Sequence, residues 1–286
     1  MARDRITKGP GGRYGGALLA TLLLALAACA PAASAPPPHD AAHPRIVSLN
    51  PCLDAILVEI APPEQVLALS HYSRDARSSS IPAGVAKRYG VTGGTAEEVI
   101  AQAPDLVLAS VYLPQPTKSA LERAGLGVAT FGSPTSIAES AAQVREVARL
   151  AGRSEAGEAL AARISQASPQ TRPAVSALLW QPGEIVAGEQ TLIAELMRQE
   201  GFVSTAAARG LKQADRVSLE DVVAHPPIVL LVAGDAPGQR HPLLEGARKH
   251  MLVAPFDPAL LYCGGPTIPH ARARLRAIRA QVEQMP

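Results

Sequence analysis

Two segments of this chain, 123 residues apart, follow one design, and this internal repeat constrains the fold more than any other feature. Residues 95–108 have the sequence TAEEVIAQAPDLVL, and residues 218–231 have the sequence SLEDVVAHPPIVLL. In each copy a hydroxyl residue, with an acid three places later, is typical of a helix N-terminus with a capping box. A proline then ends the helix, and the apolar run that follows predicts a buried parallel strand. Two such helix–strand units so far apart predict two similar α/β lobes.

The first acid of each copy lies in the exposed first turn of its predicted helix, Glu97 in one copy and Glu220 in the other. The repeat therefore predicts one carboxylate at a matched surface position on each lobe. A carboxylate at this position also stabilises its helix through the helix dipole, so its presence has a purely local explanation as well.

Residues 1–29 have the organisation of a secretory signal. A basic start precedes an apolar stretch, residues 17–28, which is too short to span a membrane. The stretch ends in Leu-Ala-Ala-Cys, which resembles a bacterial lipobox and predicts acylation of Cys29 and a lipid anchor. Cleavage after a small residue such as Ala35 is the alternative.

Residues 30–44 are rich in Ala and Pro and predict a flexible linker, in which His39 and His43 are expected to be solvated residues and not metal ligands. The whole chain has 27 Lys and Arg and 25 Asp and Glu; four and two of these lie in residues 1–44, which leaves 23 of each. A neutral body gives nucleic-acid binding no electrostatic support, and we expect none.

Two cysteines remain beyond the predicted signal, Cys52 and Cys263, in a compartment that permits disulfides. They either pair across the fold or occupy two separate buried positions. Their spacing does not decide between these arrangements.

The order of predicted elements divides the rest of the chain into three parts. Strand and helix patterns alternate over residues 45–135, which predicts an N-terminal α/β lobe. Residues 136–170 predict an amphipathic helical connection that Gly152 interrupts. Strands resume at Val175, so residues 171–286 predict a C-terminal α/β lobe. The expected fold class is α/β, with two Rossmann-like lobes that contain parallel sheets, a long helix that joins them, and a ligand cleft between them.

Aromatic residues are only 3% of the sequence, yet five of them follow predicted strand ends. They are Tyr72, Tyr112, Phe131, Trp180 and Tyr262. Ligands of parallel α/β sheets bind beyond the carboxyl ends of the strands, whereas aromatic side chains usually go to cores. The set therefore predicts an aromatic-walled pocket for a sizeable ring-containing ligand. The alternative is that two or three of the five only cap the core.

The loop after the second predicted strand supplies further candidates. Arg74 and Arg77 can pair with an anionic ligand, although surface loops often carry arginines. His71 and Tyr72 can ligate iron or haem, although a single loop histidine more often does not. Signals for catalysis are absent, since the chain has no Gly-x-Ser-x-Gly, His-Glu-x-x-His, phosphate loop or Cys-x-x-Cys. We therefore predict that the protein is not an enzyme and has no cofactor.

With these segments identified, the chain resembles the periplasmic binding proteins of ABC importers that carry cobalamin, ferric siderophores and haem. Residues 45–51 are similar to the first strand and turn of that family, and residues 97–108 match its E-x-(I/V)-x-x-x-x-P-D-L-V unit. Residues 121–128 resemble its helix-to-strand step, and the Trp180-Gln181 and Cys263-Gly-Gly-Pro266 motifs resemble one subgroup. The single motifs are loose, but their order over about residues 45–285 is specific.

The resemblance implies two lobes joined by a rigid helix, with the ligand in the cleft and little closure on binding. It also implies docking on the permease through one acid per lobe, and Glu97 and Glu220 match those positions. No set of metal-coordinating His and Glu residues is found, which argues against a binder of free zinc or manganese. The cleft candidates contain more aromatics than arginines, which favours neutral cobalamin by a small margin over anionic ferric siderophores.

We therefore expect a periplasmic, lipid-anchored protein that delivers a metal chelate, a ferric siderophore or cobalamin, to an ABC permease by binding and release alone. A haem-binding protein of the same class, a bilobal α/β enzyme and a ligand sensor are the alternatives.

Overall fold

The structure is a computed structural model that describes residues 42–166 and 173–285. The predicted secretory signal, Cys29 and nearly all of the predicted linker lie outside the described residues. Within the described residues, no helix combines the length and the apolar character needed to cross a membrane.

The N-terminal lobe is built on a five-stranded parallel sheet with the order β3-β2-β1-β4-β5. Its strands are β1 (Ile46–Ser48), β2 (Val66–Ser70), β3 (Val91–Thr92), β4 (Leu106–Ser110) and β5 (Gly127–Phe131). Its helices are α2 (Pro51–Ile60), η2 (Pro63–Gln65), η3 (His71–Arg74), α3 (Ala83–Ala86), α4 (Ala96–Ala101) and α5 (Gln115–Arg123), of which η2 and η3 are 3-10 helices. The strand order reverses between β1 and β4, which is where ligands of such sheets bind.

The C-terminal lobe repeats this arrangement with a four-stranded parallel sheet of order β7-β6-β8-β9. Its strands are β6 (Val175–Trp180), β7 (Phe202–Ser204), β8 (Val229–Ala233) and β9 (Leu252–Phe256). Its helices are η4 (Pro182–Glu184), α8 (Leu192–Gln199), α9 (Thr205–Ala208), α10 (Leu219–Ala224), η5 (Pro237–Arg240), α11 (Pro242–Ala247), η6 (Pro258–Leu260) and α12 (Thr267–Val282). The predicted fold of two parallel α/β lobes is confirmed.

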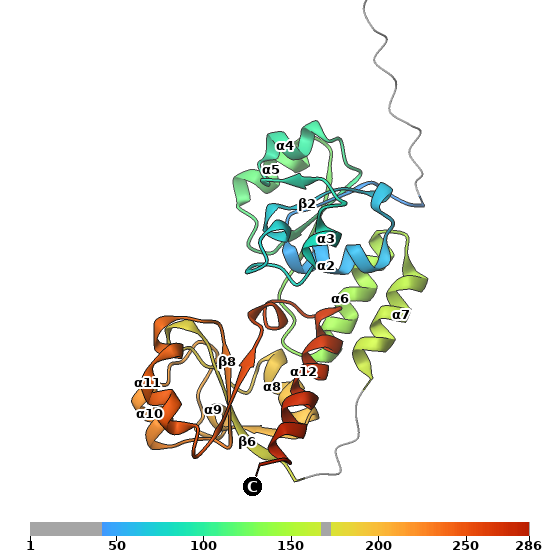
Figure 1. The fold of residues 1–286 in the computed structure, drawn as a ribbon. Helices are drawn as coiled ribbons and strands as arrows, with labels where there is room; N and C mark the ends of the chain where they lie inside the picture. Colours follow the sequence, from blue (N-terminus) through green and yellow to red (C-terminus); the bar gives the residue numbers. More distant parts are fainter. Residues whose placement is uncertain (1–41, 167–172, 286) are drawn as a thin grey trace, which may run out of the picture. The chain divides into compact units, whose positions relative to one another are not determined.

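The connection between the lobes is a pair of helices, α6 (Ile137–Leu150) and α7 (Ser154–Ser165), which pack along each other (Figure 1). The pair is interrupted at Gly152, where φ is 68° and a Cβ would overlap the carbonyl oxygen of Ala42. Only glycine fits both conditions.

The two sheets share one hydrophobic core. One face of each sheet packs against the connecting helices and α12, and the buried members include Ile46, Val144, Leu179 and Leu275. Side chains alternate along a strand, so Val47 points to a separate cluster on the outer face of the N-terminal sheet. The common core therefore holds the lobes together by packing in addition to the helical connection.

The repeated unit forms a helix and a strand in each lobe, α4 with β4 and α10 with β8. The hydroxyl of Thr95 accepts the backbone N–H of Glu98, and the hydroxyl of Ser218 accepts that of Asp221, each at 3.2 Å. The predicted helix N-termini are therefore capped as expected.

The reciprocal half of the predicted capping box does not form. The carboxylate of Glu98 accepts the Thr92 hydroxyl at 2.9 Å and the Gly93 N–H at 2.6 Å. The carboxylate of Asp221 pairs with Arg209 at 2.6 Å and with His225 at 3.0 Å. In each copy the carboxylate instead interacts with other groups, which for Asp221 include the charged guanidinium of Arg209.

A buried charged cluster fixes the end of α7 to the C-terminal lobe. Glu200, which is 1% exposed, lies 3.9 Å from Arg272 and 3.6 Å from Arg276 of α12. Arg272 also donates to the carbonyl oxygens of Ile164 and Gln166 at the end of α7. Burial raises the pKa of Glu200, and the two arginines oppose that rise.

Candidate functional site

A cavity of about 340 Å³ lies at the carboxyl ends of the strands, with walls from both lobes. The N-terminal lobe contributes Asn50, which lies after β1, and Phe131, which is the last residue of β5. The C-terminal lobe contributes Leu179 and Gln181 at the end of β6, and Tyr262 after η6. The cavity therefore occupies the place where parallel α/β sheets bind ligands.

Among the described residues that line this cavity, none is Asp, Glu, Lys, Arg or His. The polar side chains of the wall carry amides and hydroxyls, from Asn50, Ser133, Thr135, Gln143, Gln181, Thr191, Gln213 and Tyr262. An amide side chain both donates and accepts hydrogen bonds, whereas a buried charge needs a charged or strongly hydrogen-bonding partner. The cavity therefore suits an uncharged ligand that carries its own donors and acceptors.

Two of these amides are held by the backbone. Asn50 caps α2, because its Oδ1 accepts the N–H groups of Cys52 at 2.9 Å and Leu53 at 3.3 Å. Gln143 of α6 donates to the carbonyl oxygen of Gly132 at 2.7 Å and so holds the loop after β5. This part of the wall is ordered by the protein's own hydrogen bonds.

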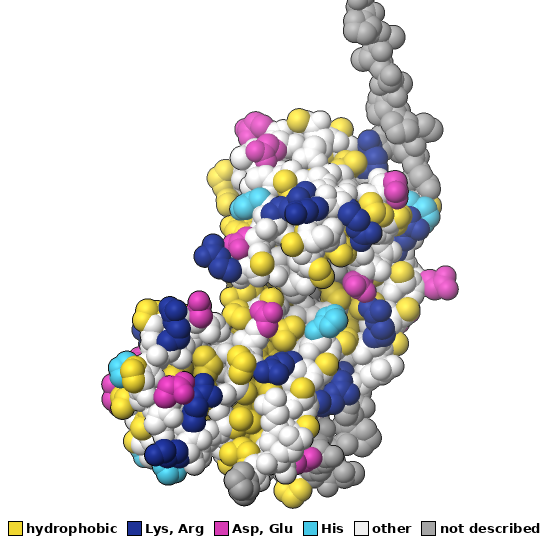
Figure 2. Space-filling view, in the orientation of Figure 1, with side chains coloured by type: hydrophobic (Ala, Val, Ile, Leu, Met, Phe, Trp, Pro, Cys, Tyr) yellow, Lys and Arg dark blue, Asp and Glu magenta, His cyan; other side chains and the backbone are white. Residues whose placement is uncertain are grey.

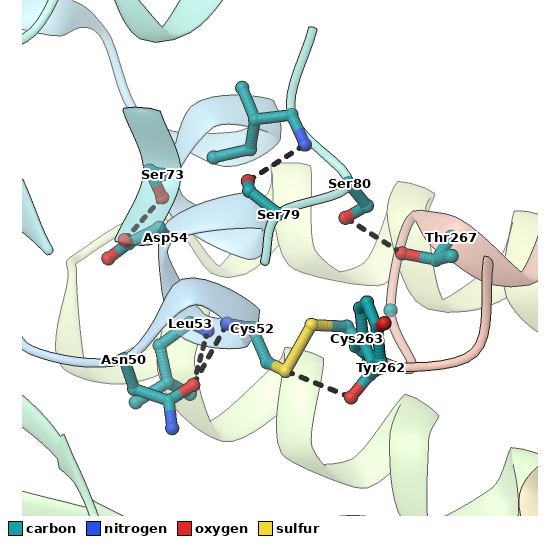
Figure 3. Close-up of a disulfide and its surroundings, with 12 residues drawn as sticks. Asn50, Cys52, Leu53, Asp54, Ser73, Ser79, Ser80, Tyr262, Cys263 and Thr267 are labelled. Atoms are coloured by element: carbon teal, nitrogen blue, oxygen red, sulfur yellow. Dashed lines mark hydrogen bonds between the residues drawn. A yellow bond between two sulfur atoms is a disulfide. The ribbon is translucent and has the colours of Figure 1, made fainter. Parts of the chain in front are cut away.

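Cys52 and Cys263 both line the cavity and are joined by a disulfide (Figure 3). Their Cα atoms are 5.1 Å apart, although the residues are separated by 211 positions in the sequence. Of the two arrangements that the sequence left open, the structure has the paired one. The bond joins the first turn of α2 to the segment that leads into α12.

Phe131 and Tyr262 line the cavity, as two of the five predicted aromatic wall residues. Tyr72 and Tyr112 are not among the lining residues. Tyr72 lies on η3 with its ring centroid 4.0 Å from that of His71, and Tyr112 is 84% exposed after β4. A single wall containing all the predicted aromatics is therefore not formed here.

Trp180 requires a correction, because it is 1% exposed and belongs to the core of the C-terminal lobe. Its indole Nε1 donates to the carbonyl oxygen of Val217 at 2.8 Å. Side chains alternate along a strand, so Leu179 faces the cavity and its neighbour Trp180 faces the opposite way. The predicted strand end was right, but the predicted side of the strand was wrong.

The candidate arginines also lie away from the cavity. The guanidinium of Arg74 donates to the carbonyl oxygen of Tyr89 at 2.7 Å, and Arg77 lies 3.4 Å from Asp75. Neither arginine is among the cavity-lining residues, so neither provides a charge partner inside it.

Asp54 of α2 is fully buried and holds η3 against that helix (Figure 3). Its Oδ2 accepts the N–H and the hydroxyl of Ser70, at 3.0 and 2.5 Å, and the hydroxyl of Ser73 at 2.6 Å. Burial raises the pKa of Asp54 to about 7, although hydrogen bonds from Ser48, Ser70 and Ser73 favour the charged form. The loop after β2 is thus anchored by a carboxyl group that titrates near neutral pH.

Glu97 and Glu220 are both exposed, in the first turns of α4 and α10. The backbone N–H of Glu220 itself and the hydroxyl of Ser218 hold the pKa of Glu220 below its usual value. Charged side chains of both signs are interspersed over the face of the molecule in Figure 2.

Asn50, Gln143, Gln181 and Gln213 were not predicted as wall residues. Gln181 directly follows β6, and Asn50 lies two residues beyond the end of β1, so the strand-end rule could have found them. Gln143 lies on a helix and Gln213 on a loop, and no local signal singles them out. No group of three or more His, Cys, Asp or Glu side chains able to hold a metal ion occurs in residues 42–166 and 173–285.

A known protein family matches a large part of this chain. The family model described as periplasmic binding protein matches residues 46–251. No curated protein sequence matches the chain.

Solved structures share the fold at low sequence identity. The periplasmic haem-binding protein RhuT from Roseiflexus sp. RS-1, in its apo form, is 22% identical with a TM-score of 0.65, over 85% of this chain and 98% of its own. The periplasmic haem-binding protein HutB of Vibrio cholerae is 17% identical with a TM-score of 0.68, over 82% and 98%. The periplasmic vitamin B12 binding protein BtuF of Vibrio cholerae is 17% identical with a TM-score of 0.63, over 85% and 99%.

Proposed function

This chain belongs to the periplasmic binding protein family, and from that premise we propose that it captures a metal chelate and delivers it to an ABC-transporter permease. Structures of the same fold are named as binders of haem and of vitamin B12. The cavity with walls from both lobes is the proposed capture site. Binding and release, without covalent chemistry, are the proposed mechanism.

The cargo proposed is a neutral chelate with amide groups on its rim, that is, a corrinoid such as cobalamin. The observation that carries this choice is the uncharged wall of the cavity. The propionates of haem or the anionic groups of many ferric siderophores would be buried there without a charged partner, which is unfavourable. Corrinoid amides can exchange hydrogen bonds with Asn50, Gln143 and Gln181, and the ring faces can pack against Phe131 and Tyr262.

The cavity volume of about 340 Å³ is near the lower end for ligand pockets. We therefore propose that part of the chelate enters the cavity and the rest lies against the exposed rims of the lobes. Tyr72, Tyr112 and Arg74 remain candidates for contact with that outer part. Haem remains the alternative cargo, with the adjacent rings of His71 and Tyr72 as its support.

Docking on the permease is proposed to use Glu97 and Glu220. Both are exposed at the same position of the repeated unit, one on each lobe. Carboxylates of this kind, facing basic permease loops, would set orientation and encounter rate more than affinity. Acylation of Cys29, which would keep the protein at a membrane surface in the periplasm, is part of the same proposal.

A thermal-shift screen of the chain without residues 1–29 tests the cargo. The probes are cyanocobalamin, hemin, and one anionic and one neutral ferric siderophore. Cyanocobalamin is expected to raise the melting temperature in a concentration-dependent way, because a ligand that binds only the folded state stabilises it by mass action. Stabilisation by hemin or by the anionic siderophore alone would contradict the neutral-cargo proposal, and no stabilisation by any probe would remove the carrier proposal.

A further inference from the structure

The segment from residue 261 to 267 follows the last strand of the C-terminal lobe but is fastened to the N-terminal lobe (Figure 3). Cys263 is bonded to Cys52 of α2. The hydroxyls of Thr267 and Ser80 lie 3.1 Å apart, so a hydrogen bond joins the segment to the loop before α3. The segment therefore crosses from one lobe to the other at the wall of the cavity.

The backbone of this segment has no room to move toward α6. The N–H of Gly265 donates to the buried hydroxyl of Ser140 at 2.7 Å. A Cβ on Gly264 would come 2.5 Å from the same hydroxyl oxygen and 3.0 Å from Pro134. Two consecutive glycines thus allow the close approach that brings Cys263 within bonding distance of α2.

Tyr262 immediately precedes the bonded cysteine and is one of the two aromatic residues in the cavity wall. It is half exposed, so packing restrains only part of it. Its carbonyl oxygen lies 3.3 Å from Sγ of Cys52. The backbone of Tyr262 is therefore held on its C-terminal side by the disulfide and the contact with Cys52.

We propose that the Cys52–Cys263 disulfide is a positioning element for ligand binding, which fixes the width of the cavity between the lobes and holds Tyr262 at its wall. The inference rests on the proposed function, because it takes this cavity as the ligand site. Without the bond, the segment loses its covalent tie to the first turn of α2, and the hydrogen bonds to Ser140 and Ser80 remain. The tyrosine then loses its fixed place beside the ligand.

A double-mutant cycle tests the proposal, with cyanocobalamin as the probe. The variants are Cys52→Ala with Cys263→Ala, Tyr262→Ala, and all three changes together. If the disulfide acts by holding Tyr262, each of the first two variants binds the probe about tenfold more weakly than the original chain. The triple variant then binds at most about threefold more weakly than Tyr262→Ala, because the two losses overlap. Losses that multiply in the triple variant, or unchanged affinity after removal of the disulfide, would overturn the proposal.

Two controls separate positioning from general loss of structure. Thr267→Val removes a hydrogen bond from the same segment but keeps the disulfide, and its affinity is expected to stay close to that of the original chain. If the double-cysteine variant does not fold, mild reduction of the folded chain with a phosphine gives the open form directly. Full affinity after reduction would equally overturn the proposal.

Hydrogen exchange without ligand keeps this proposal distinct from the cargo proposal. Removing the disulfide is expected to speed exchange of the backbone amides from residue 261 to 265, while those of β1 and β4 are unchanged. Failure of the original chain to bind cyanocobalamin would count against the cargo alone. Unchanged exchange in the 261–265 amides would count against the positioning role whatever the cargo.

Discussion

Asp54 and Glu200 are the acidic side chains that the described residues of the two lobes bury, and their surroundings are opposite in kind. In the N-terminal lobe, Asp54 is held by serine hydroxyls and has no cation among its hydrogen-bond partners. In the C-terminal lobe, Glu200 lies between two arginines, yet neither of its oxygens accepts a hydrogen bond from a described residue. Neutral hydrogen-bond donors stabilise the buried carboxylate of the N-terminal lobe, whereas nearby positive charges stabilise that of the C-terminal lobe.

Burial raises the pKa of both acids, but the groups that oppose the rise are different. Hydroxyl donors do not offset the burial of Asp54, so its pKa is about 7. A proton on Oδ1 leaves the three hydrogen bonds to Oδ2 in place. The arginines beside Glu200 oppose protonation instead, so the stability of that region depends on keeping both signs of charge together.

The largest effect on the free energy of unfolding is expected for Arg272→Ala. The change leaves Glu200 with a weaker charge partner and removes the donors to the last carbonyl groups of α7. Breaking a buried ion pair by removing one partner costs about 3–5 kcal/mol, measured here as the free energy of unfolding in urea. The double change of Arg272 and Glu200 to leucine is the control, because it removes both charges and is expected to recover part of the loss. A cost below about 1 kcal/mol for the single change would show that the cluster is not a structural tie.

Asp54→Asn is expected to change how stability depends on pH. The folded-state pKa of Asp54, about 7, lies above the ordinary aspartate value of 3.8, so the folded state binds more protons than the unfolded state between these two values. Stability from this group is present below about pH 4 and is lost as pH rises through about 7, by about 1.4 kcal/mol for each pH unit crossed between the two pKa values. The difference in unfolding free energy between the original chain and Asp54→Asn should therefore fall from pH 4 to pH 8. A difference that stays constant, or rises, would contradict the assignment.

The two helix caps should behave alike, in contrast to the two buried acids. Thr95→Ala and Ser218→Ala each remove one hydroxyl acceptor at 3.2 Å from a backbone N–H. Each is expected to lower the free energy of unfolding by about 1 kcal/mol. The exchanges Thr95→Ser and Ser218→Thr keep a cap and serve as controls. A loss of stability in only one of the two alanine variants would mean that the hydroxyl caps its helix in one lobe but not in the other.

The smallest effect on stability is expected for charge reversal at Glu97 or Glu220, because both side chains are exposed. The melting temperature and ligand affinity should be unchanged, while uptake through the permease falls. Glu155→Lys is the matched control, since Glu155 is an exposed acid in the first turn of α7 on the connection between the lobes. Uptake that is normal in both Glu97→Lys and Glu220→Lys, with folding intact, would remove the docking proposal.

The sequence was sufficient to predict the two parallel lobes because continuous apolar runs and capped helices are local signals. The repeat predicted one strand in each lobe, and these strands are β4 and β8. Each of them has a parallel neighbour on both sides. The interruption of the connection at Gly152 was equally visible, because glycine is common where a helix ends, and here a Cβ would also overlap the carbonyl oxygen of Ala42.

The wall of the cavity was harder to predict, because a strand end gives the position of a side chain but not its direction. Trp180 and Leu179 are neighbours, and only Leu179 faces the cavity. The side of the sheet on which a residue falls depends on register with the core, which a single sequence does not reveal. The amides of Asn50 and Gln181 were overlooked because amide side chains are common on surfaces and carry no distinctive pattern.

The central claim, that an uncharged cavity selects a neutral chelate, is tested most directly by titrating the original chain and the Gln181→Arg variant with cyanocobalamin and with hemin. Gln181 lines the cavity, and an arginine there adds a positive charge without removing any residue from the core. The account predicts saturable binding of cyanocobalamin by the original chain, weakened at least about tenfold in Gln181→Arg, with hemin bound better by the variant than by the original. Tighter binding of hemin than of cyanocobalamin by the original chain, or identical affinities of the two chains for both ligands, would contradict it.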